Sequence, residues 1–246
     1  MIGEMSDVYS VANKKKELQR KEHLKLAYEQ RINSPTFLGR DVSNRLDFTG
    51  GNTEKLEQSG LPVITTFAEL SSTLETTPNN LQWLTYERDS QKIDHYTRFE
   101  IPKKSGGSRL ISSPKPALRN AQKWILGSIL NKLDIHSAAT AFRPGKSILD
   151  NAKLHANSKV VLRLDLKDFF PSITFIRIRG LFESLGYNPG ISTVFSLLCT
   201  DSPRIILKYN GETNFVKVGS LSLPQGACTS PALANIIANK LDRRLQ

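Results

Sequence analysis

Residues 160–173, VVLRLDLKDFFPSI, hold the residue types and spacing that most clearly predict chemistry. The apolar first half, Val160 to Leu166, is typical of a buried β-strand, and Asp165, Asp168 and two aromatic residues lie at its end. A carboxylate at the end of a buried strand is costly unless it binds a cation or accepts hydrogen bonds. Oxygen ligands suit Mg²⁺, so Asp165 is a candidate metal ligand. Taken alone, the motif is equally consistent with an Asp165 that caps a helix or pairs with an arginine.

A second motif, LSLPQGACTSPALANIIANKLD, spans residues 221–242 and places a Pro-Gln-Gly turn before a helix. Ser230 is the expected N-cap of that helix, with proline at its first position. Gln225 on such a turn can touch a nucleotide or a template, and Gly226 lets another backbone come close. In isolation, a simple entry into the helix is the better interpretation of this motif.

Basic residues also lie on a glycine-bearing turn in IPKKSGGSRLISSPKP, residues 101–116. Lys103, Lys104 and Arg109 can reach a triphosphate from such a hairpin, because phosphate oxygens accept charge-assisted hydrogen bonds from cations. The usual alternative is a solvated basic turn.

A fourth segment, AFRPGKSILDNAKLH at residues 141–155, combines Arg143, Lys146 and His155. A single histidine is more often structural than catalytic. A zinc site is not expected, because no second histidine or cysteine stands at ligand spacing.

Helices, hairpins and one strand must position these residues. We expect a solvated helix at 8–31, a loop or linker at 32–60 and a better ordered region from Leu61. The resulting domain division is an extension and linker at 1–60, a helical region at 61–95 and a main domain at 96–246. The other expected elements are helices at 66–74, after Pro78, after Pro116, at 174–185 and from Ser230, hairpins at 96–114 and around Asn210-Gly211, and the strand at 160–166.

The charge of the chain points to a polyanionic partner. Of the net charge of +11, residues 61–246 carry +10 and residues 1–60 only +1. A basic surface on a folded domain favours nucleic acid, although many basic proteins bind none. Two cysteines are too few for a disulfide framework and fit a reducing cytoplasm. The sequence has no apolar stretch long enough to span a membrane and no apolar core of a signal peptide near its start.

Taken together and in this order, the four motifs resemble those of the reverse transcriptase family over roughly residues 61–246. LDLKDFF resembles its first palm motif, LPQGACTSP its Pro-Gln-Gly motif, IPKKSGGSRLISSP its fingers hairpin, and AFRPGKS a motif shared with group II intron enzymes. The element from Asn151 to His155, NAKLH, resembles a mark of the retron members. The resemblance implies an α+β fold, with the fingers and an incomplete palm of a right-hand polymerase after a helical N-terminal extension.

The resemblance also implies roles for individual residues. Asp165 is the catalytic metal-binding aspartate, with the Leu166 carbonyl as a second ligand, and Phe170 is the gate that rejects a ribose 2′-hydroxyl. Nucleotide-binding residues are Lys103, Arg109, Asp168, Phe169, Phe170, Gln225 and Gly226, and RNA-binding residues are Arg143, Lys146, Asn151 and His155.

The implied function is RNA-directed DNA synthesis on a structured noncoding RNA, from deoxynucleoside triphosphates with Mg²⁺ as the cofactor. Retron systems usually act in defence against phage, often with an effector protein. Both statements are what the resemblance implies.

One departure from the family pattern is decisive for activity. No Tyr/Phe-x-Asp-Asp motif occurs in the sequence, and Asp201 and Asp242 sit in no matching motif. We therefore expect an N-terminal portion of a polymerase that is inactive alone. Alternatives are a group II intron or diversity-generating enzyme, against which NAKLH argues, a noncatalytic RNA-binding protein, or one half of a split polymerase.

Overall fold

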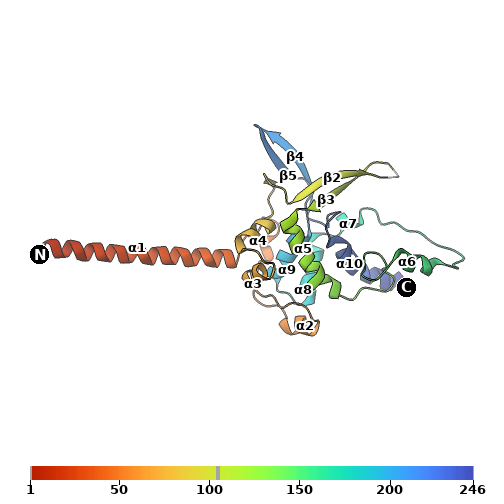
Figure 1. The fold of residues 1–246 in the computed structure, drawn as a ribbon, viewed down its shortest axis with the longest axis horizontal. Helices are drawn as coiled ribbons and strands as arrows, with labels where there is room; N and C mark the ends of the chain where they lie inside the picture. Colours follow the sequence, from red (N-terminus) through yellow and green to blue (C-terminus); the bar gives the residue numbers. More distant parts are fainter. Residues whose placement is uncertain (1, 104–105, 246) are drawn as a thin grey trace.

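The computed structural model describes residues 2–103 and 106–245, and in its first helix the side chains of residues 14–30. Lys104 lies outside these residues. The first helix, α1 (Ile2–Asn33), projects as a rod from the rest of the molecule (Figure 1). Residues 14–30 are all exposed, which confirms the expected solvated helix. No helix in the described part of the chain is long and apolar enough to cross a membrane.

A group of short helices packs around one central helix to form the body. The central helix α9 (Pro189–Cys199) is buried from Gly190 to Cys199, including the polar side chains of Ser192, Thr193 and Ser196. It contacts α8, α5, α4, α3 and a short 3-10 helix, η1. These and the neighbouring elements are η1 (Ser43–Arg45), α2 (Thr53–Gln58), α3 (Phe67–Thr73), α4 (Pro78–Thr85), α5 (Pro116–Ser128), η2 (Leu130–Lys132) and α8 (Phe175–Leu185).

Local signals start and end these helices. Thr66 and Glu69 form a reciprocal capping box at the start of α3, and Thr77 caps α4 ahead of Pro78. Gly186 ends α8 in the left-handed conformation, with φ of 118°. The expected helices at 66–74, after Pro78, after Pro116 and at 174–185 are therefore confirmed.

Two antiparallel hairpins project from the same end of the helical body (Figure 1). One pairs β2 (Tyr96–Pro102) with β3 (Ser108–Pro114). The other pairs β4 (Arg204–Tyr209) with β5 (Glu212–Lys217), and the short β1 (Ser90–Gln91) joins β5 at the edge. Both hairpins confirm the sequence prediction. The turn residues Asn210 and Gly211 have φ of 48° and 76°, the backbone that a two-residue hairpin turn requires.

The segment 34–60 differs from the expected loop or linker, because it is packed into the core. Leu38, Val42 and Leu56 are buried. The Gly190 amide donates to the Asp47 carbonyl oxygen at 2.6 Å, and the Asn52 amide donates to the Gly186 oxygen at 2.7 Å. These bonds dock the segment against Gly186, at the end of α8, and Gly190, in the first turn of α9, which lie far away in the sequence.

The expected strand at 160–166 is absent, and this prediction was wrong. The segment has no regular secondary structure, and the side chains of Val160 and Leu162 are 85% and 80% exposed. A strand is stable only when its backbone groups bond to a neighbouring strand, and no described segment pairs with this one. Along the chain the segment connects α6 (Ile148–His155) to α7 (Phe169–Ser172), and α10 (Ser230–Leu245) follows β5.

The mixture of helices with small antiparallel sheets agrees with the expected α+β class. The assignment of fingers and palm, and the domain limits, stay predictions.

Candidate active site

A cleft with a volume of about 220 Å³ lies between the β2–β3 hairpin and the loop that leads into α10. It brings together four of the predicted nucleotide-binding residues, Lys103, Arg109, Asp168 and Gln225. The hairpin also contributes Arg98, Ser108, Leu110 and Ser112, and the opposite side contributes Pro171, Asp201, Pro203, Ser222, Leu223 and Pro224.

The β2–β3 hairpin holds two exposed cations over this cleft. Arg109 pairs with Ile101 across the strands, and Lys103 directly follows β2. The turn is closed by hydrogen bonds from the Lys103 amide to the Gly107 oxygen at 3.0 Å and from the Gly106 amide to the Lys103 oxygen at 3.1 Å. A guanidinium and an ammonium on one wall form a surface suited to phosphate oxygens.

The opposite wall is the Gln225 turn, residues 223–226, which is fixed against β3. The Ser112 amide donates to the Gln225 carbonyl oxygen at 2.7 Å. Gly226 has φ of 117°, and a Cβ added there would lie 2.8 Å from the Ser112 oxygen. The predicted close approach of another backbone at Gly226 is thus confirmed. The Gln225 Oε1 atom is buried and lacks a hydrogen-bond partner among the described residues.

Asp168 reaches the cleft from the start of α7. Its backbone is left-handed, with φ of 49°, and its carbonyl oxygen accepts a bond from the Ser172 amide at 2.9 Å. Phe169 and Phe170 are half-buried, pack against the core and contact each other edge to face, with ring centroids 6.2 Å apart. Their proposed roles at the nucleotide stay predictions.

Asp165 and Leu166 are not brought into the cleft. Both lie on the exposed, unpaired segment 160–166, and neither lines the cleft. Within the described part of the chain, no group of three or more His, Cys, Asp or Glu side chains is placed to hold a metal ion. The residues present therefore supply at most part of a metal site.

The four residues predicted to bind RNA also lie outside the cleft. Lys146, Asn151 and His155 are exposed on or beside α6, which buries none of its residues. Arg143 is half-buried, and its Nη1 atom donates to the carbonyl oxygens of His136 at 3.0 Å and Ala139 at 3.2 Å. Part of the Arg143 side chain thus holds a loop together.

Sequence reasoning missed a buried charged group at the base of the cleft. Arg98 of β2 donates from Nε to Asp94 at 2.7 Å and from Nη1 and Nη2 to the two carboxylate oxygens of Asp201 at 2.5 and 3.0 Å. Burial alone would lower the pKa of Arg98, but the bonds and charges of Asp201 and Asp94 outweigh it and raise that pKa. Asp94 stands four residues before Arg98, which is a local signal, whereas nothing in the sequence marks Asp201 as its partner.

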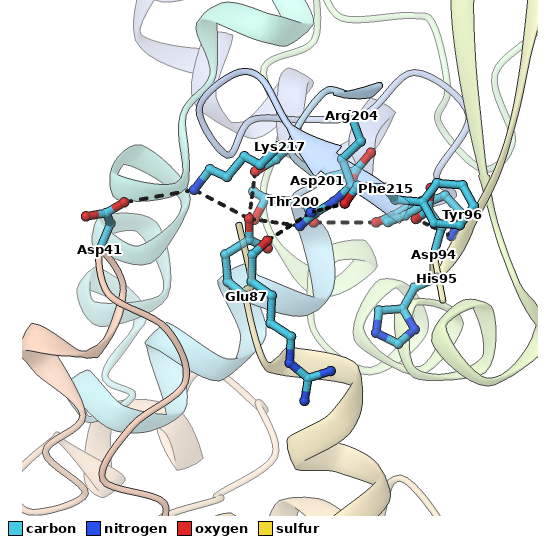
Figure 2. A network of polar contacts seen from close by, with 12 residues as sticks. Asp41, Glu87, Asp94, His95, Tyr96, Thr200, Asp201, Arg204, Phe215 and Lys217 are labelled. Carbon is cyan, nitrogen blue, oxygen red and sulfur yellow. Dashed lines mark hydrogen bonds and ion pairs between the residues drawn. The ribbon is translucent and has the colours of Figure 1, made fainter. Parts of the chain in front are cut away.

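A second cluster of ion pairs lies beside the first and fixes the β4–β5 hairpin (Figure 2). Glu87 accepts hydrogen bonds from the Ser202 hydroxyl at 2.9 Å and from Arg204 Nη2 at 3.1 Å, and Lys217 Nζ lies 3.4 Å from the same carboxylate oxygen. In Figure 2, Asp201 and Tyr96 lie next to this cluster. The bases of both hairpins are therefore held by buried charges.

Comparisons with known proteins agree on one family. The sequence profile of the family "Reverse transcriptase (RNA-dependent DNA polymerase)" matches residues 101–246. The retron Mx162 reverse transcriptase of Myxococcus xanthus is 41% identical over 78% of this chain and 40% of its own length. The retron Mx65 enzyme of the same organism is 38% identical over 92% of this chain and 52% of its own length. The retron Ec86 enzyme of Escherichia coli is 36% identical, with 79% and 55% covered. The chain spans about half the length of these relatives.

Proposed function

Because this chain belongs to the reverse transcriptase family, we propose that it forms the nucleotide-binding part of a retron RNA-directed DNA polymerase. The observation that carries the proposal is the cleft in which Lys103 and Arg109 face Asp168 and Gln225. The proposed substrates are deoxynucleoside triphosphates and the template is a structured noncoding RNA. A role in defence against phage, with an effector protein as partner, is part of the same proposal.

In this proposal the two hairpin cations bind the triphosphate of the incoming nucleotide. Arg109 offers a planar fork of donors to phosphate oxygens, and Lys103 adds a point charge beside it. Gln225 lines the same cleft, which supports a contact of this residue with a nucleotide or template group. Phe170, two residues after Asp168 on α7, is the proposed gate against a ribose 2′-hydroxyl.

The proposed cofactor is Mg²⁺, with the Asp165 carboxylate and the Leu166 carbonyl as two of its ligands. The described residues do not assemble the remaining ligands, so we assign no chemical step to the metal. Two-metal nucleotidyl transfer requires several carboxylates around the reacting oxygens. The sequence lacks the Tyr/Phe-x-Asp-Asp motif, so we propose that these 246 residues alone bind nucleotide but do not polymerise.

Titration of the chain with a deoxynucleoside triphosphate in the presence of Mg²⁺ tests the cleft directly. Isothermal calorimetry should show binding that Arg109→Ala weakens about tenfold, as expected for loss of a charge-assisted contact. The matched control is Arg88→Ala, because Arg88 is exposed and lies outside the cleft, over the Tyr86 ring. Absence of binding, or an equal loss in both variants, would reject the proposed nucleotide site.

A further inference from the structure

The two walls of the cleft are tied together beneath it by a closed series of polar contacts. Arg98 and Ser112 are paired residues of β2 and β3, and Arg98 Nη1 donates to the Ser112 hydroxyl at 2.9 Å. The same guanidinium holds Asp201 through two nitrogens. Arg98 therefore joins the hairpin wall to the residue that follows Thr200, at the end of α9.

The remaining contacts lead from both ends of this link to the Gln225 turn. Asp201 and Ser222 exchange backbone hydrogen bonds at 3.0 and 3.1 Å, three residues before Gln225. On the other side, the Ser112 amide donates to the Gln225 carbonyl oxygen at 2.7 Å. The contacts thus form a ring, which we call the Arg98 ring: Arg98, Ser112, Gln225, Ser222 and Asp201.

Charge-assisted hydrogen bonds make the Arg98 ring rigid. Arg98 is largely buried and makes charge-assisted hydrogen bonds to two buried carboxylates, Asp94 and Asp201. Bonds of this kind are short and directional, and the planar fork of arginine fixes both partners at once. A lysine at this position would keep the charge but could not reproduce the fork. Ser112 links Arg98 to the Gln225 turn, because its hydroxyl accepts a hydrogen bond from Arg98 and its amide donates one to the Gln225 carbonyl oxygen.

We propose that Arg98 is a positioning residue that sets the spacing between the hairpin cations and the Gln225 turn, and thereby the affinity for the incoming deoxynucleotide. This inference rests on the proposed function of the cleft. Arg98 acts through Ser112 and Gln225. Disturbing the ring should loosen the Gln225 turn while leaving the cations of the hairpin in place.

The test compares Arg98→Lys and Ser112→Ala with Ser113→Ala. Ser112→Ala removes only the hydroxyl link and leaves Arg98 paired with both carboxylates. Ser113 is the matched control, because its hydroxyl accepts from Arg119 at 3.1 Å outside the ring. Two quantities are measured on the 246-residue chain: hydrogen exchange of the backbone amide of residue 112, and the dissociation constant of dGTP with Mg²⁺.

Both ring variants should speed exchange of amide 112 and weaken dGTP binding about three- to tenfold, the range for loss of one hydrogen bond. Ser113→Ala should change neither quantity. Unchanged protection of amide 112, or lost protection with unchanged dGTP affinity, would overturn the inference. If neither the unaltered chain nor Arg109→Ala binds dGTP, the proposed function of the cleft is rejected. Hydrogen exchange of amide 112 in the ring variants still tests the Arg98 ring in that case. Arg98→Lys is the variant at greater risk of misfolding, and Ser112→Ala keeps the test decisive.

Discussion

Ser112 and Gln225, far apart in the sequence, are joined by a backbone hydrogen bond of 2.7 Å from the Ser112 amide to the Gln225 carbonyl oxygen. This bond places a turn of the Pro-Gln-Gly motif directly on the hairpin that carries Lys103 and Arg109. Two motifs that are each unremarkable alone thereby become the facing walls of one cleft.

Gly226 should be the glycine least tolerant of a side chain near the cleft. Gly226→Ala introduces both a strained φ and a Cβ that lies 2.8 Å from the Ser112 oxygen. Gly211→Ala is the matched control, because Gly211 also has positive φ but nothing within 4 Å of its Cβ position. Urea unfolding should show a loss of about 1 kcal/mol for Gly211→Ala and about 2–4 kcal/mol for Gly226→Ala. Equal losses would mean that the Gln225 turn does not pack on β3.

Leu56 should contribute to the core although it lies in a segment expected to be a linker. Its side chain is 1% exposed, so Leu56→Ala should lower the free energy of unfolding by about 2–5 kcal/mol. The comparison is Val63→Ala, at a site 41% exposed, where a loss below about 1 kcal/mol is expected. A loss at Leu56 no greater than that at Val63, again by urea unfolding, would show that the segment 34–60 is not docked.

His95 should make the folded state sensitive to mild acid. Burial lowers the pKa of His95 below its ordinary value near 6.5, against the opposing effect of a bond with the Trp83 carbonyl oxygen. The unfolded chain then binds a proton more readily than the folded one, so stability is lost as pH falls below about 6.5 toward the folded pKa.

To test this prediction, the free energy of unfolding is measured between pH 7.5 and 5, and its slope against pH is compared between variants. His95→Gln keeps a donor for the Trp83 oxygen but cannot titrate, so its slope should be shallower than that of the unaltered chain. His23→Gln, at an exposed position on α1, should leave the slope unchanged. Identical slopes for all three proteins would contradict the burial of a neutral imidazole at position 95.

Binding of structured RNA should depend steeply on salt. The net charge of +10 on residues 61–246 predicts release of several counterions on binding. The dissociation constant, measured by filter binding from 50 to 300 mM KCl, should rise by at least about 100-fold. A flat response would remove nucleic acid from the proposed partners.

Much of the local structure was predictable because its causes are local. Pro78 at the start of α4, the Asn210-Gly211 turn and the apolar spacing of α5 each act within a few residues, and each element formed where expected. The grouping of Lys103, Arg109, Asp168 and Gln225 was anticipated through the resemblance to reverse transcriptases, not through spacing.

The failures share a different cause, since each depends on a distant partner. The segment 160–166 has the composition of a strand but no neighbouring strand among the described residues, so its backbone stays unpaired. Leu38 and Leu56 are buried in a segment that docks on distant parts of the chain, where the Gly190 amide donates to Asp47 and the Asn52 amide donates to Gly186. The pairing of Arg98 with Asp201 joins two positions that no sequence pattern connects.

The central proposal, that this chain forms the nucleotide-binding part of a polymerase and needs further carboxylates to polymerise, is tested most directly by primer extension on an RNA template with Mg²⁺. Three proteins are compared: the 246-residue chain, the chain extended by the C-terminal half of a retron reverse transcriptase, and the extended chain with Asp165→Asn. Of the three proteins, we predict that only the extended chain with an intact Asp165 synthesises DNA, because nucleotidyl transfer needs Asp165 together with further carboxylates. Robust synthesis by the 246-residue chain, or by the extended chain carrying Asp165→Asn, would contradict it.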